Sequence, residues 1–128
     1  MKAKKKKIVI VEDDSVLRRR LVDMLTDEGF KVYEASDGEA GLALAQKKRP
    51  DLLLLDIVMP KMTGISLLEK LHADEKTKDI GAIFLTNLSD TQKIAEALEH
   101  KAFEYLIKSD WALEDVAKKV KHHLEMDV

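Results

Sequence analysis

Short apolar runs alternate with helix-like segments along the whole chain, and this alternation constrains the fold more than any other feature. The runs at residues 8–11 and 52–55 are continuously apolar, which indicates strands that are covered on both faces. The predicted strands are residues 8–11, 30–35, 52–55, 82–86 and 103–107. The segments after them repeat apolar residues at helical spacing, and the predicted helices are residues 14–28, 36–48, 64–73, 89–100 and 111–125.

A strand–helix unit that repeats five times with short connections predicts an α/β protein, in which a five-stranded parallel sheet has helices on both faces. Local signals support the helix ends. Gly29 is predicted to stop the first helix. Ser36 followed by Glu39 has the form of a capping box and is predicted to open the second helix.

Length and composition narrow the function classes. The 128 residues form one domain by length. The formal net charge of -2 gives no general attraction to nucleic acid or to an anionic membrane. Cysteine is absent, which fits a reducing cytoplasm. A run of lysines opens the chain, but no apolar core of a signal peptide follows it, and no apolar run approaches the roughly 20 residues of a membrane span. We therefore expect a cytoplasmic protein that does not contact membranes.

Polar residues collect where four of the five predicted strands end. In an open parallel sheet, ligands bind beyond the carboxyl ends of the strands. Acids clustered there favour a hard divalent cation such as Mg²⁺, while a lysine and a hydroxyl suit an anion. Together they predict a phosphoryl-transfer site with the acid of the third strand as nucleophile. These strand-end residues are Glu12, Asp13, Asp14, Asp56, Thr86 and Lys108.

Each strand-end residue also has a simpler interpretation. Asp56 alone could cap a loop, and the acidic run at 12–14 could cap the first helix, where negative charge favours the helix dipole. Asp14 in particular could do only that. Thr86 could be an ordinary β-branched strand residue, and Lys108 a surface charge. The joint arrangement favours the phosphoryl-transfer interpretation.

The same motifs resemble the receiver domain of two-component response regulators, and the resemblance covers essentially the whole chain, residues 1–128, as a single domain. The motifs are the acidic run after the first strand, 55–60 with Gly64, Leu85-Thr86, and 105–108. The resemblance implies a flavodoxin-like fold with strand order 2-1-3-4-5. It also implies Mg²⁺-dependent phosphorylation of Asp56 by a sensor histidine kinase or a phosphotransfer protein.

The resemblance assigns roles to the metal ligands. Asp13 and Asp56 would bind the metal directly, with the carbonyl oxygen of Val58 as a third protein ligand. Glu12 would hold a metal-bound water.

Further roles concern the phosphoryl group and the signal. Thr86 and Lys108 would bind the phosphoryl group, and Thr86 would move towards it. Tyr105 would turn inward as Thr86 leaves its space. The signalling face would comprise 89–100, 103–107 and 111–125.

Two positions depart from the pattern of the family. Ser109 follows Lys108 where the family usually has proline with a cis peptide, so we expect a trans bond here. Asn87 follows Thr86 where a small residue is frequent, and it would narrow access to the phosphoryl group.

Other functions fit less well. A hydrolase of the haloacid dehalogenase type would need an acid at position 58, which is valine. A flavin carrier would need a phosphate loop where the acidic run at 12–14 would repel phosphate. A phosphorylation-independent interaction module stays open as the alternative. We expect no turnover of external substrates and no direct DNA binding by this chain. The output would come from a downstream protein partner or from a C-terminal output domain.

Overall fold

The computed structural model describes residues 5–86, 104–107 and 112–125. The strands are β1 (Lys7–Val11), β2 (Lys31–Ala35), β3 (Leu52–Asp56), β4 (Gly81–Thr86) and β5 (Glu104–Ile107). The helices are α1 (Ser15–Asp27), α2 (Gly38–Lys48), α3 (Gly64–His72) and α5 (Leu113–Glu125). The helix expected at 89–100 lies outside the described residues.

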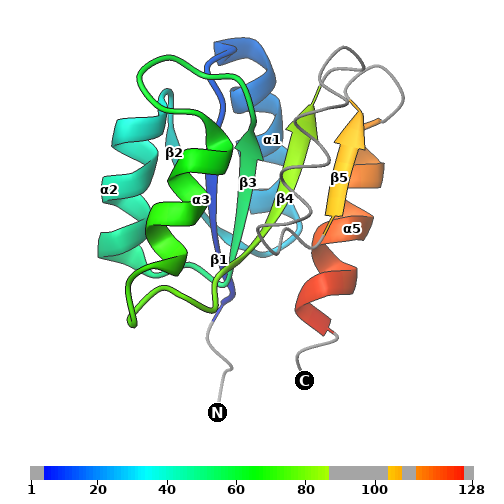
Figure 1. The fold of residues 1–128 in the computed structure, drawn as a ribbon. Coiled ribbons are helices and arrows are strands. Elements are labelled where there is room, and N and C mark those ends of the chain that lie inside the picture. Colours follow the sequence, from blue (N-terminus) through cyan, green and yellow to red (C-terminus); the bar gives the residue numbers. More distant parts are fainter. Residues whose placement is uncertain (1–4, 87–103, 108–111, 126–128) are drawn as a thin grey trace.

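The strands form a parallel sheet in the order β2-β1-β3-β4-β5. Helices α2 and α3 cover one face of this sheet, and α1 and α5 cover the other (Figure 1). The prediction of an α/β fold with a parallel sheet between two helical layers is therefore confirmed. None of the helices in the described part of the chain combines the length and apolarity that crossing a bilayer requires.

The leucine run of β3 divides its side chains between two cores. Leu53 and Leu55 belong to the cluster beneath α2 and α3, whereas Leu52 and Leu54 belong to the cluster beneath α1 and α5. Successive side chains in a strand point to opposite faces. Since helices cover both faces of this sheet, all four leucines are buried. A continuous apolar run is what a central strand with helices on both sides requires.

Gly29 ends α1 as the sequence predicts. Its φ is +99°, a left-handed conformation that glycine adopts without a steric penalty. The amide of Gly29 donates to the carbonyl of Thr26 (3.0 Å), and the amide of Phe30 donates to that of Leu25 (3.1 Å). These two bonds form a Schellman motif that satisfies the last carbonyls of the helix.

The predicted start of α2 is wrong by one position. Asp37, not Ser36, is the N-cap: its backbone is extended, and its side chain accepts from the amide of Ala40 at 2.9 Å. The helix begins at Gly38. Aspartate and serine are equally good N-caps, so the pattern of residue types alone does not choose between them.

Candidate functional site

Three acids from two neighbouring strands meet at the carboxyl edge of the sheet. Strands β1 and β3 pair with Ile8 opposite Leu52 and Val11 opposite Leu55, and one further step in this register sets Glu12 opposite Asp56. One carboxylate oxygen from each of Glu12, Asp13 and Asp56 lies within 4.8 Å of the others. The structure thus brings together the three acids that the sequence predicts.

Glu12 is fully buried and forms the floor of this acid cluster. Its Oε2 accepts from the amide of Asp14 at 3.1 Å. Its own amide donates to the carbonyl of Ala35 at the end of β2 (3.1 Å). Arg18 of α1 donates from Nη1 to the Glu12 carbonyl oxygen (2.8 Å) and from Nε to Glu34 (2.9 Å). The turn after β1 is therefore held from two sides.

Asp56 closes β3 and is only 6% exposed. The backbone beside it is crowded, because a Cβ added at Gly64 would overlap the carbonyl of Asp56 and press on the ring of Phe84. The amide of Gly64 also donates to the carbonyl of Ile57 at 2.9 Å. A glycine at the start of α3 thus lets the helix sit directly against the end of β3.

Asp13 is the exposed member of the acid cluster. Val58, in the loop that begins directly after Asp56, is also exposed (51%). The cluster therefore has a buried floor and a mouth that a ligand can reach from solvent.

The third acid of the run, Asp14, has a different role. Its Oδ1 accepts from the amides of Val16 and Leu17, at 3.0 and 3.1 Å. Asp14 is the N-cap of α1, which confirms the simpler interpretation for this residue alone. The acidic run therefore divides between a helix cap and the acid cluster.

The donor set of the cluster fits a hard divalent cation. Three carboxylates in so small a space repel one another, and a cation relieves that repulsion. All three ligands offer oxygen, which Mg²⁺ and its relatives prefer, and three protein groups leave coordination positions for water or phosphate. The acid cluster can therefore hold a magnesium ion beside Asp56.

Two of the remaining predicted site residues, Thr86 and Tyr105, lie in the neighbouring strands β4 and β5. Thr86 is the last residue of β4, one position beyond Leu85, which pairs with Asp56. Tyr105 lies in β5 opposite Phe84. Lys108, together with Asn87 and Ser109, lies outside the described residues. The backbone of Thr86 thus reaches the edge of the sheet that carries the acids.

Sequence reasoning missed Arg18. It belongs to a run of three arginines on α1, and its helical position alone does not distinguish it from Arg19. The signal that separates them is burial, because the Arg18 side chain is only 19% exposed. A partly buried arginine needs acceptors, and the end of β1 and Glu34 supply them.

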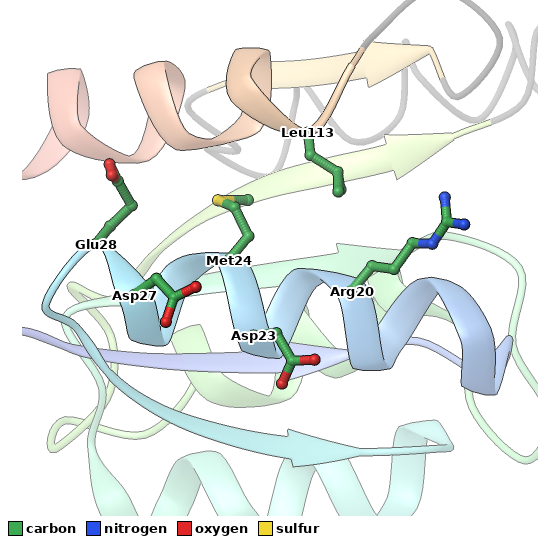
Figure 2. A pocket seen from close by; sticks show the side chains of 6 residues that line it. All are labelled: Arg20, Asp23, Met24, Asp27, Glu28 and Leu113. Atoms are coloured by element: carbon green, nitrogen blue, oxygen red, sulfur yellow. The ribbon is translucent and has the colours of Figure 1, made fainter.

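A groove of about 470 Å³ runs between α1 and the start of α5. Figure 2 shows the side chains that line it. They are Arg20, Asp23, Met24, Asp27, Glu28 and Leu113. None of the site residues predicted from the sequence is among them, so this groove is separate from the acid cluster.

Comparison with known proteins gives the family. The sequence pattern of the response regulator receiver domain matches residues 8–121. The chain belongs to this family. The fold agrees, since a CheY-like response regulator receiver domain protein from Methanospirillum hungatei has a TM-score of 0.88 at 29% identity, over 96% of both chains.

Curated relatives add a second fact about this receiver domain. It is 38% identical over 108 residues to a probable transcriptional regulator, ycf27, of Cyanophora paradoxa, a match that covers 84% of this chain and 44% of the relative. It is 35% identical over 102 residues to the DNA-binding dual master transcriptional regulator RpaA of Synechocystis sp., covering 80% of this chain and 42% of the relative. The chain spans less than half the length of these two regulators.

Proposed function

We propose that this receiver domain accepts a phosphoryl group on Asp56 in a Mg²⁺-dependent reaction. The observation that carries the proposal is the acid cluster, in which one oxygen each of Glu12, Asp13 and Asp56 lies within 4.8 Å of the others. Asp13, Asp56 and the carbonyl of Val58 would bind the metal, and Glu12 would hold a metal-bound water. We also propose that residues 1–128 form a single domain with five strands and five helices.

The chemistry is a single displacement at phosphorus. A carboxylate oxygen of Asp56 attacks the phosphorus of a phosphohistidine, the P–N bond breaks, and the imidazole of the donor leaves with its electron pair and takes up a proton. A magnesium ion held by Asp13, Asp56 and the carbonyl of Val58 would supply positive charge for the phosphoryl oxygens. Thr86 donates its hydroxyl and Lys108 its ammonium to those oxygens, which orients the group for in-line transfer.

The partner on the input side is a histidine kinase or a phosphotransfer protein. The new phosphoryl group adds about -1.5 to -2 charges at the edge of the sheet. We infer that Thr86 and Tyr105 report this change to the face made by 89–100, β5 and α5, where it shifts the balance of two conformers. The domain would also catalyse its own dephosphorylation, without turning over an external substrate.

We infer that the output is not carried by the receiver domain itself. The two curated relatives are named as transcriptional regulators, and each is more than twice as long as the matched segment. This supports a C-terminal output domain or a separate downstream partner. Direct DNA binding would then belong to that output, and the receiver domain would work in the cytoplasm.

Mass spectrometry of the intact protein tests this function. Incubation with Mg²⁺ and a small acyl phosphate should add one phosphoryl mass to the wild-type chain. The Asp56→Asn variant should gain none. Asp51→Asn, which changes an exposed aspartate at the other end of β3, should behave like the wild type. Removal of the metal with EDTA should abolish the gain.

A different result would favour the alternative function. If neither the acyl phosphate nor a phosphorylated histidine kinase labels the wild-type protein, the chain is an interaction module that works without phosphorylation.

A further inference from the structure

The amino end of α2 packs against the loop that follows β3. Gly38, the first residue of α2, has no space for a side chain, because an added Cβ would overlap the carbonyl oxygen and the Cβ of Met62. The amide of Gly38 points at the carbonyl of Pro60, at a long 3.4 Å. Because Gly38 faces the carbonyl of Met62, the loop backbone would have to move to admit a larger residue.

The loop has an unusual conformation at the point of contact. Lys61 has a φ of +70°, which L residues other than Asn, Asp and Gly rarely adopt. The amide of Met62 donates to the carbonyl of Pro60 at 2.8 Å, which makes a tight γ-turn around Lys61. Turns of this hand are uncommon and costly, so surrounding contacts must hold them in place.

Asp37 supplies one of those contacts. Its Oδ1 caps α2 by accepting from the amide of Ala40 (2.9 Å), while its Oδ2 lies 3.8 Å from Nζ of Lys61. One carboxylate thus joins the start of a helix to the turn in the loop. At the other end of the loop, Gly64 packs on the carbonyl of Asp56.

We propose that Asp37 and Gly38 are positioning residues for the metal and phosphorylation site. They fix the loop at 57–63, which carries Val58 and begins directly after Asp56, so that its backbone is already in place when the metal binds. This inference rests on the function proposed above. Neither residue belongs to the acid cluster, so both act on the site through the loop.

Replacing Gly38 by alanine tests the steric contact. We expect Gly38→Ala to weaken Mg²⁺ binding about tenfold in isothermal titration calorimetry, the lower end of the range for residues that support metal ligands. In the metal-free protein, the amide resonances of the non-proline residues in 57–63 should shift.

Gly29→Ala is the matched control for loss of stability. It introduces strain at a φ of +99° with nothing within 4 Å of the new Cβ, at the opposite edge of the sheet. Its Mg²⁺ affinity should stay within about twofold of the wild type.

Two further variants test the polar contact, and they remain informative if Gly38→Ala does not fold. Asn caps helices as well as Asp does, so Asp37→Asn keeps the cap and removes only the charge that faces Lys61. We expect Asp37→Asn to weaken Mg²⁺ binding about two- to threefold, and Lys61→Gln to have the same effect. The double variant should be no weaker than either single one.

The proposal is overturned if Gly38→Ala and Asp37→Asn both retain wild-type Mg²⁺ affinity, or if Gly29→Ala loses as much as Gly38→Ala. A wild-type protein that binds no Mg²⁺ would instead refute the proposed function. The shifts of the 57–63 amides in metal-free Gly38→Ala would then still decide whether Gly38 holds the loop.

Discussion

Arg18 links three segments through a single side chain. From α1 it reaches the carbonyl of Glu12 at the end of β1 and the carboxylate of Glu34 in β2. A hydrogen bond to a charged group contributes about 1.5–3 kcal/mol. Arg18 therefore stabilises the backbone from which two of the clustered acids extend.

We expect Arg18→Gln to lower the free energy of unfolding by about 1–3 kcal/mol, because the carbonyl of Glu12 loses its charged donor. Urea denaturation followed by circular dichroism measures this change. Arg19→Gln removes an exposed neighbour of the same type and should change stability by less than about 0.5 kcal/mol. Equal losses in both variants would show that the Arg18 contacts contribute little.

Individual residues differ in how far sequence predicts them. Glu12, Asp13 and Asp56 were predictable because strand ends of a parallel sheet converge on one edge. Arg18 was not, because its role depends on where a long side chain ends in three dimensions. The choice of Asp37 over Ser36 as the cap was not predictable either, because both residue types are good N-caps and the local backbone conformation decides between them.

At the scale of elements, helix α3 depends on the residue that precedes it. Thr63 is its N-cap, and its Oγ1 accepts from the amide of Ser66 at 3.1 Å. Because α3 begins at Gly64, against the carbonyl of Asp56, the cap also determines how closely the helix meets β3.

We predict that Thr63→Ala lowers the free energy of unfolding by about 1 kcal/mol, since an amide of the first turn loses its acceptor. Thermal melts should show Thr63→Ser close to the wild type, because serine retains the acceptor. Thr26→Ala changes an exposed threonine in the last turn of α1, and a loss there as large as at Thr63 would contradict the capping argument.

Elements were predictable where one physical cause dominates. The continuous apolar runs of β1 and β3 predicted both strands, because burial on two faces leaves no position for polar residues. Gly29 marked the end of α1, because few other residues tolerate its φ. The γ-turn at Lys61 left no signal, since lysine is not a residue that such a turn favours.

At the scale of the whole molecule, two kinds of contact hold α5 on the sheet. Val116 and Val120 are fully buried in the core shared with α1. At the surface, Nζ of Lys121 lies 2.6 Å from Oε1 of Glu28 at the end of α1. The ion pair is short, but both side chains are partly exposed, and such pairs contribute little.

Val120→Ala should therefore lower the free energy of unfolding by about 2–3 kcal/mol, through lost apolar burial and the cavity that remains. Lys121→Met should lower it by less than about 1 kcal/mol. Guanidinium titrations of both variants give the comparison. A larger effect at Lys121 would mean that charge, and not packing, fixes the position of α5.

The pairing of β1 with β3 determines which insertions and deletions the gene can tolerate. Glu12 meets Asp56 because both strands keep the same count of residues from their paired starts at Ile8 and Leu52. Loss of one codon within 52–55, with the start of the strand kept in register, would turn the carboxylate of Asp56 to the opposite side of the sheet and exchange the faces of any leucines that follow the lost position. Mutations that change the length of the exposed connection at 73–76 leave that count intact. Selection on this gene should accordingly tolerate insertions there and reject them inside the third strand.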